Sequence, residues 1–128
     1  MCGEDARQSL RAGAAAVQVS NHGGRQQDGV PAAISVLRSV VDAVEGQTPV
    51  LFDSGIRRGV DVFRAVALGA TAVAIGRPVI YGLVVGGARG VSGVLDHLGA
   101  ELRTAMLVAG VARISDITGG HLLLGAGR

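Results

Sequence analysis

The stretch AAAVQVSNHGGRQ, residues 14–26, joins a short apolar run to a polar loop that is rich in glycine. Its first part, 14–19, has the length and the β-branched content of a buried strand. Its second part, 20–26, therefore begins where that strand ends. Ligands of α/β proteins bind at the carboxyl edge of the parallel sheet, so this loop is the first candidate for a functional site.

The rest of the chain repeats the same strand–loop–helix pattern. The expected elements are, in order, a helix at 4–12, a strand at 14–19, a helix opened by Pro31 and broken at 46–49, a strand at 50–52, a helix at 60–68, a strand at 71–75, a short helical turn at 79–85 and, beyond Gly86-Gly87, a helix at about 91–109. Strands that alternate with helices pair in parallel, which predicts the α/β class. No low-complexity linker interrupts residues 1–128, so we expect one domain.

The composition and the net charge of the chain argue against a nucleic-acid-binding or membrane protein. The chain has 128 residues, of which 48% are hydrophobic and 21 are glycine, with a net charge of +2. Every basic residue is arginine, and these are scattered among few aromatics, so we expect no nucleic-acid partner. Glycines and charged residues interrupt the apolar runs. The N-terminus does not have the basic segment followed by an apolar segment that is typical of a signal peptide. The only cysteine is Cys2. We therefore expect a cytoplasmic protein without a membrane segment, and we assign no metal site.

Two side chains of the first loop suggest proton transfer and carboxylate binding. His22 supplies an imidazole, which accepts protons near neutral pH, and Arg25 supplies a guanidinium fork, which binds a carboxylate through two parallel hydrogen bonds. A base beside a carboxylate anchor suits proton or hydride removal from a small acid. The alternatives are a solvent-exposed loop histidine and a surface ion pair between Arg25 and Asp28.

Two later loops favour a phosphate group. Residues 53–57 and Gly76-Arg77 each follow an expected strand, and each loop carries glycine and arginine. Backbone N–H groups at a strand-to-helix turn, with an added guanidinium, are a common anion site. The Gly-Arg-Pro sequence alone would indicate only a turn, but two such loops in tandem are more specific.

These motifs resemble those of the FMN-dependent 2-hydroxy acid dehydrogenases and oxidases, which include glycolate oxidase, lactate oxidase and lactate monooxygenase. Residues 20–26 match every position of that family's active-site signature. The similarity continues through 28–31, 53–59 and 75–78, in the family's order and spacing, and covers roughly residues 3–115.

The resemblance implies a role for each matched residue. His22 would be the catalytic base, Arg25 would bind the substrate carboxylate, and FMN would be the cofactor. The implied FMN-binding residues are Ser20, Asp53, Ser54, Gly55, Ile56, Arg57, Gly76 and Arg77. For Ser20 a plain strand-terminal turn is an equal alternative. The implied reaction is oxidation of a small L-2-hydroxy acid, such as lactate, to the 2-oxo acid.

The length of the chain limits this expectation. A closed (β/α)8 barrel needs about 250 residues. The resemblance therefore implies a partial TIM barrel, made of the last three βα units, with the N-terminal two-thirds absent. The complete protein is expected to be a homo-oligomer. The family also uses a lysine near the flavin, and this chain contains none. The alternative is therefore a truncated, inactive remnant that binds flavin or phosphate weakly at most.

Overall fold

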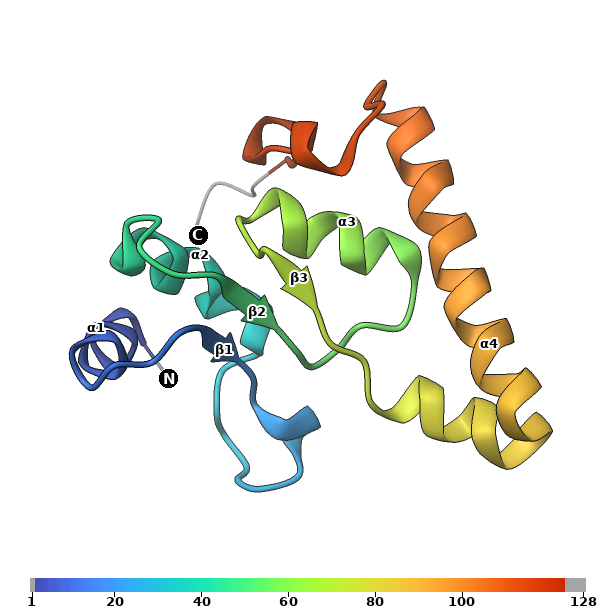
Figure 1. Ribbon diagram of the computed structural model, residues 1–128, viewed down its shortest axis with the longest axis horizontal. Helices are drawn as coiled ribbons and strands as arrows, with labels where there is room; N and C mark the ends of the chain where they lie inside the picture. Colours follow the sequence, from blue (N-terminus) through green and yellow to red (C-terminus); the bar gives the residue numbers. More distant parts are fainter. Residues whose placement is uncertain (1, 124–128) are drawn as a thin grey trace.

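Three short strands run parallel at the centre of the computed structural model, which describes residues 2–123 (Figure 1). They are β1 (Val17–Val19), β2 (Val50–Phe52) and β3 (Ala72–Val73), in the order β1-β2-β3. Both pairs are parallel, with Gln18 opposite Leu51 and Leu51 opposite Ala72. The α/β class and the parallel pairing predicted from the sequence are therefore confirmed.

The strands are shorter than the apolar runs that predicted them. The expected strands at 14–19 and 71–75 shrink to Val17–Val19 and Ala72–Val73, whereas 50–52 is found as expected. The backbone bonds from Thr71 N to the Val50 carbonyl and from Ala74 N to the Phe52 carbonyl continue the β2–β3 contact on either side of β3. The apolar runs predicted where the backbone is extended. The strands themselves are shorter, because the hydrogen bonds between strands stop where the neighbouring strand ends.

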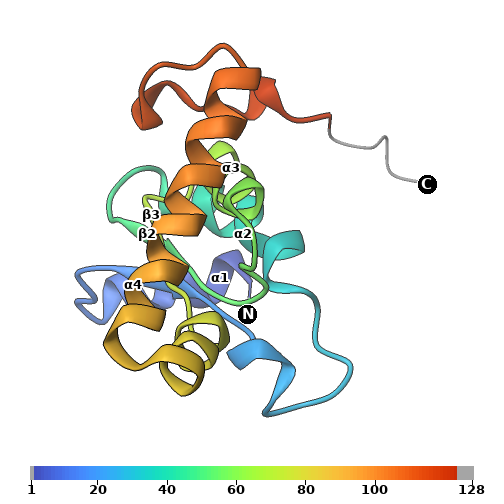
Figure 2. The ribbon, with the colours of Figure 1, turned by 90° about the vertical axis from the view of Figure 1, so that its right-hand side faces the viewer.

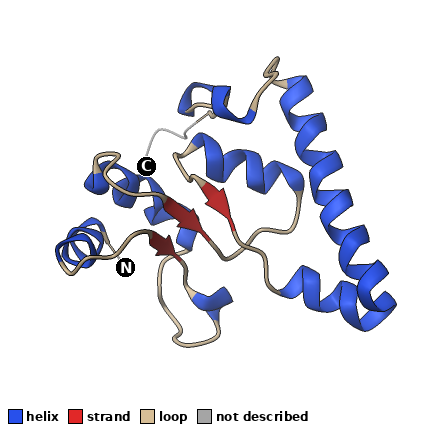
Figure 3. Ribbon diagram, viewed as in Figure 1, coloured by secondary structure: helices blue, strands red, loops and turns tan. Residues whose placement is uncertain are grey.

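Helices cover one face of the sheet (Figures 1 and 3). These are α1 (Gly3–Arg11), α2 (Ala33–Val44) and α3 (Gly59–Ala67). Helix α2 begins at Ala33 rather than at Pro31, because Ala32 keeps an extended conformation with ψ of 134°. The helix therefore begins two residues later than the sequence predicted.

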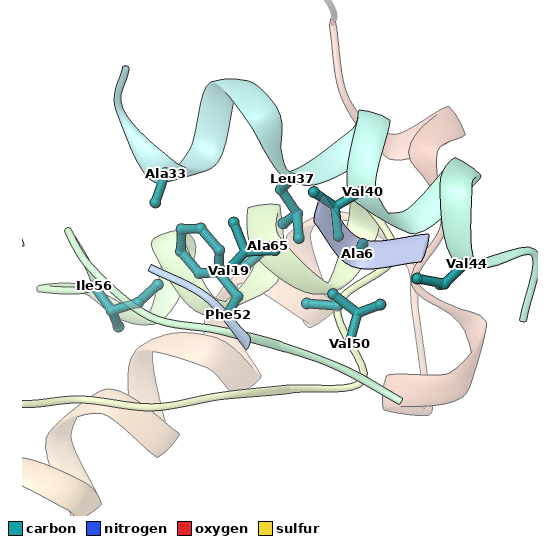
Figure 4. Close-up of a cluster of buried hydrophobic side chains, with 11 residues drawn as sticks. Ala6, Val19, Ala33, Leu37, Val40, Val44, Val50, Phe52, Ile56 and Ala65 are labelled. Atoms are coloured by element: carbon teal, nitrogen blue, oxygen red, sulfur yellow. The ribbon is translucent and has the colours of Figure 1, made fainter. Parts of the chain in front are cut away.

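The core lies between the sheet and these helices (Figure 4). Val19 and Phe52 project from the sheet and are each 1% exposed, while Leu37 of α2 is fully buried against them. Each of these side chains gains about 1.5–3 kcal/mol from burial. The opposite face, which carries Gln18 and Ala72, is exposed. Helices on one face only are what a partial barrel requires, because the other face of its sheet forms the barrel interior.

A long helical segment, α4 (Arg77–Val108), follows β3 and bends sharply near its first third (Figure 2). The backbone leaves helical geometry at Gly86 and Gly87, and Gly87 has φ of 57°. The sequence predicted this break. By length and composition alone, α4 is the one helix among residues 2–123 that could cross a membrane, and its helical geometry is interrupted at Gly86 and Gly87.

Glycines set the packing around α4. A Cβ on Gly90 would lie against the Gly82 carbonyl, so the two arms of the bend approach each other backbone to backbone. A Cβ on Gly59 would meet the backbone at Leu102, which brings α3 and α4 equally close. Beyond α4, the short turns η2 (Ile114–Asp116) and η3 (Gly119–His121) return the chain to α3.

Candidate functional site

The carboxyl ends of the three strands open into one cavity, with a volume of about 790 Å³. Three loops line it, one after each strand. Its lining includes the following predicted site residues: His22, Arg25, Asp53, Ser54, Gly55, Ile56, Arg57, Gly76 and Arg77. Ser20 is the one predicted residue outside this lining. The sequence placed the nine residues in three separate motifs, and parallel pairing brings them to the same edge of the sheet.

His22 opens a single 3-10 turn, η1 (His22–Gly24), directly after β1. Its φ is 55°, a left-handed conformation that is uncommon outside glycine and is concentrated at functional sites. Its backbone N–H donates to Ser20 Oγ at 3.0 Å, so Ser20 does form the strand-terminal turn that was its alternative role. The His22 side chain is exposed toward the cavity that it lines.

Arg25 lies on the same turn and is also exposed. No hydrogen bond or ion pair joins it to Asp28 in the part of the chain that the structure describes, so the surface-pair alternative gains no support. Its guanidinium therefore remains available to an anion in the cavity. Arg25 and His22 therefore reach this cavity from one short turn.

Asp53 and Ser54 begin the loop after β2 and are both half-buried. The Ser54 hydroxyl donates to Asp53 Oδ1 at 2.9 Å, and Gln18 Nε2 donates to Asp53 Oδ2 at 3.4 Å. Ser54 Oγ also accepts N–H bonds from Asn21 at 3.3 Å and from Gly23 at 3.1 Å. The first and second loops are thus joined through a single hydroxyl.

Helix α3 follows this loop, and its Asp61 side chain caps its N-terminal end. Asp61 Oδ2 accepts the backbone N–H groups of Arg57 at 3.1 Å and Arg58 at 3.0 Å. Two of the backbone N–H groups just before this helix, those of Arg57 and Arg58, are therefore already held by an internal carboxylate. What the loop still offers is the exposed Arg57 guanidinium and the open space at Gly55, where an added Cβ would have no neighbour within 4 Å.

The third loop brings an arginine back to the first. Gly76 precedes α4, and Arg77 begins it. Arg77 Nη2 donates to the carbonyl oxygen of Gly23 at 3.1 Å. Gly23 has φ of 67°, which favours glycine, and an added Cβ would lie 2.9 Å from that nitrogen, so the end of the Arg77 side chain would have to shift. As at Gly55, the space around Gly76 is open.

The charges of the cavity favour an anionic ligand. Arg25, Arg57 and Arg77 line it, and Asp53 is the one carboxylate among its described lining residues. Guanidinium groups bind phosphate and carboxylate groups through paired hydrogen bonds. The cavity therefore suits a ligand, or a pair of ligands, carrying both kinds of anion.

Sequence reasoning missed two features of this site. Tyr81 lines the cavity but is not among the predicted site residues. It lies four residues after Arg77 on α4, so the two share a helix face, and that spacing was a usable signal. The Ser54 contacts to the first loop span 31 and 33 residues, and nothing in the sequence announced them.

Comparison with known proteins bears directly on this site. A family model described as FMN-dependent dehydrogenase matches residues 1–124. An L-lactate oxidase of Lentilactobacillus hilgardii is 57% identical over 120 residues, which make up 94% of this chain and 32% of that protein. A peroxisomal (S)-2-hydroxyacid oxidase of Arabidopsis thaliana is 53% identical over 119 residues, which make up 93% of this chain and 33% of that protein.

Solved structures give the same result. A lactate oxidase of Pediococcus acidilactici superposes with a TM-score of 0.90 at 53% identity, over 92% of this chain and 33% of the other. A mandelate oxidase variant with an FMN adduct superposes with a TM-score of 0.86 at 48% identity, over 90% of this chain and 37% of the other. The chain thus spans about a third of the length of its relatives, the share expected for three βα units out of eight.

Proposed function

The chain belongs to the FMN-dependent dehydrogenase family, and from that premise we propose that it serves the FMN-dependent oxidation of a small L-2-hydroxy acid to the 2-oxo acid. One observation carries the proposal: a single cavity collects His22 and Arg25 together with the arginine-bearing loops after β2 and β3. The names of the relatives, which include lactate, hydroxy acid and mandelate oxidases, support the substrate class.

The residues around the cavity fit FMN. Arg57 and Arg77 supply positive charge for its phosphate, and the open space at Gly55 and Gly76 lets a flat or bulky group approach the backbone. Asp53 can accept hydrogen bonds from ribityl hydroxyls, because ionised carboxylates accept at both oxygens. When bound, FMN supplies the acceptor for the two electrons that leave the substrate's α-carbon.

The side chains of the first loop act on the substrate. Arg25 holds the carboxylate, which fixes the orientation of the α-carbon and its hydroxyl. His22 accepts one of the two protons that the oxidation releases, from the hydroxyl or from the α-carbon. The second proton leaves with the electron pair or passes to solvent. The imidazole then returns its proton to water, which restores the base.

A second candidate is flavin or phosphate binding without turnover. The observation behind it is that β1 and β3 each pair with one strand only, so the sheet has two open edges and an uncovered face. The chain also lacks the lysine that the family resemblance implies beside the flavin. This candidate keeps the phosphate loops and the anion-binding arginines, but it loses stabilisation of the reduced flavin.

An anaerobic absorbance experiment separates these candidates. The purified protein is mixed with FMN, and L-lactate, glycolate or L-lactamide is then added while the flavin absorption band is followed. We expect a bound flavin that is bleached by the acids and not by the amide, because Arg25 needs a carboxylate. Bound flavin that resists every acid would favour binding without turnover. Protein that remains colourless after unbound FMN is removed would contradict the proposed oxidation and would favour the inactive remnant.

A further inference from the structure

The loop that carries His22 has few hydrogen bonds of its own. Within the loop, the one backbone–backbone bond runs from Gly24 N to the Asn21 carbonyl at 3.0 Å. The N–H groups of Asn21 and Gly23, which flank His22 on both sides, instead donate to Ser54 Oγ at 3.3 and 3.1 Å. A single hydroxyl from the neighbouring loop therefore holds the backbone on either side of the proposed base.

The Ser54 hydroxyl is surrounded by hydrogen-bonding partners from its own chain. The O–H donates to Asp53 Oδ1 at 2.9 Å, and Ser20 Oγ lies 3.3 Å from Ser54 Oγ, a contact in which either hydroxyl can donate. Gln18 Nε2 donates to the other carboxylate oxygen of Asp53 at 3.4 Å. Ser54 Oγ thus lies within a hydrogen-bond network while it accepts the two backbone N–H groups.

The backbone of Ser54 gives an independent reason to assign the hydroxyl a role. Ser54 has φ of 87°, in the left-handed region where glycine is strongly favoured, and Gly55 follows it with φ of 84°. Non-glycine residues in that region carry backbone strain, and they persist where the surroundings compensate. Glycine would remove this strain at Ser54, but it would also remove the hydroxyl that binds the first loop.

We propose that Ser54 is a positioning residue: its hydroxyl holds the Asn21–Gly23 backbone and thereby sets where the His22 imidazole lies in the cavity. This role differs from the cofactor contact that sequence resemblance assigned to Ser54. Its catalytic meaning rests on the proposed function, in which His22 is the base. The structural part of the proposal stands without flavin, substrate or turnover.

Amide hydrogen exchange, measured by NMR on the 128-residue chain without ligand, tests the structural part. Ser54→Ala removes the hydroxyl and keeps a side chain, while Ser54→Gly removes the hydroxyl and relieves the backbone strain. Because a single net hydrogen bond changes an equilibrium by roughly 2- to 10-fold, we expect both variants to raise exchange at Asn21 and Gly23 by about that factor. Exchange at Ala65 in the core of α3 should stay unchanged.

Ser20→Ala is the comparison variant, because it keeps the Ser54 hydroxyl and removes a neighbouring one. Ser20 Oγ accepts the N–H of His22 and also lies 3.3 Å from Ser54 Oγ, so this variant removes one contact of Ser54 but not its bonds to Asn21 and Gly23. This variant should raise exchange at His22 and leave Asn21 and Gly23 protected. Two outcomes would overturn the proposal. One is unchanged protection at Asn21 and Gly23 in both Ser54 variants. The other is loss of protection in Ser54→Ala with full protection in Ser54→Gly, which would assign the effect to the backbone alone.

The catalytic part has its own readout in a flavin-loaded enzyme. A misplaced base should lower kcat while FMN affinity stays as in the unaltered protein, whereas a lost cofactor contact would weaken FMN binding. If Ser54→Gly lowers FMN affinity and leaves kcat unchanged, the positioning role is wrong. The exchange experiment uses no FMN, so its result is independent of whether the proposed oxidation occurs.

Discussion

Arg77 reaches across the cavity edge, and its Nη2 donates to the carbonyl oxygen of Gly23 at 3.1 Å. The two residues are 54 positions apart, in the loops after β3 and β1. Since Ser54 joins the loop after β2 to the same first loop, all three loops are linked around His22. The phosphate-binding loops and the proton-accepting loop of the proposed site are therefore one connected structure.

Gly23→Ala tests that link, and Gly24→Ala is its control. Both glycines have left-handed φ values, 67° and 72°, so an alanine at either position costs about 1–2 kcal/mol of backbone strain. Only a Cβ at Gly23 meets Arg77, while the space at Gly24 is open. We expect Gly23→Ala to lower Tm, and FMN affinity, by more than Gly24→Ala. Equal losses in the two variants would show that the Arg77 contact contributes nothing.

His22→Gln removes the proposed base and keeps a polar side chain of similar reach. General-base catalysis contributes about 10²- to 10⁴-fold, so we expect flavin reduction by L-lactate to slow by that factor. FMN affinity should not change, because the arginines proposed to bind the phosphate are untouched. Rapid-mixing absorbance measures the reduction rate, and fluorescence quenching measures FMN binding. Reduction at an unaltered rate would remove His22 from the base role.

Gly90→Ala and Gly93→Ala test how the bend in α4 is held. Alanine is favoured over glycine inside a helix by about 1 kcal/mol, so Gly93→Ala, which meets open space, should raise Tm. The same change at Gly90 places a methyl group against the Gly82 carbonyl and should lower Tm. Thermal unfolding followed by circular dichroism distinguishes the two. A rise in both variants would mean that the arms of α4 do not pack as described.

Glu101 links α3 to α4, and it predicts a dependence of stability on pH. Its carboxylate accepts the N–H of Gly59 at 2.7 Å and pairs with Arg58 at 2.7 Å. These contacts, that with Gly59 first, hold the pKa of Glu101 below its usual value. A lowered folded-state pKa stabilises the protein above the usual glutamate pKa, and that stabilisation is lost as pH falls through the lowered pKa.

The variant Glu101→Gln should therefore have a lower Tm than the parent at neutral pH. The difference should persist down to about pH 4.3, the usual glutamate pKa, and shrink below it. Both proteins should carry His97→Gln, since the His97 imidazole lies 3.3 Å from the same carboxylate. A difference in Tm that grows as the solution is acidified would contradict this assignment.

Local patterns predicted the fold well where they were strong. The β-branched run at 50–52 and the glycine pair at 86–87 gave the position of a strand and of a helix break. Strand ends at 14–16 and 74–75 were overestimated, because an apolar run does not show where a neighbouring strand stops. The co-location of the three loops followed from parallel pairing alone.

The finer links within the site were beyond sequence reasoning. The Ser54 and Arg77 contacts to the first loop depend on strand register and on backbone φ values, which no local pattern encodes. Asp61 is different, because an acidic residue at the third position of a helix is a recognised capping signal. Reading that signal would have shown that Asp61 accepts backbone N–H groups just before α3, those of Arg57 and Arg58.

The central claim is that the loops after β1, β2 and β3 form one FMN site. Chemical-shift mapping of the ¹⁵N-labelled chain, titrated with FMN and separately with riboflavin, tests it most directly. We predict that FMN shifts amides in all three loops, at 22–25, 53–57 and 76–77, and that the shifts at 55–57 and 76–77 shrink with riboflavin, which lacks the phosphate. Shifts confined to the α3–α4 interface, or to a single loop, would contradict the account.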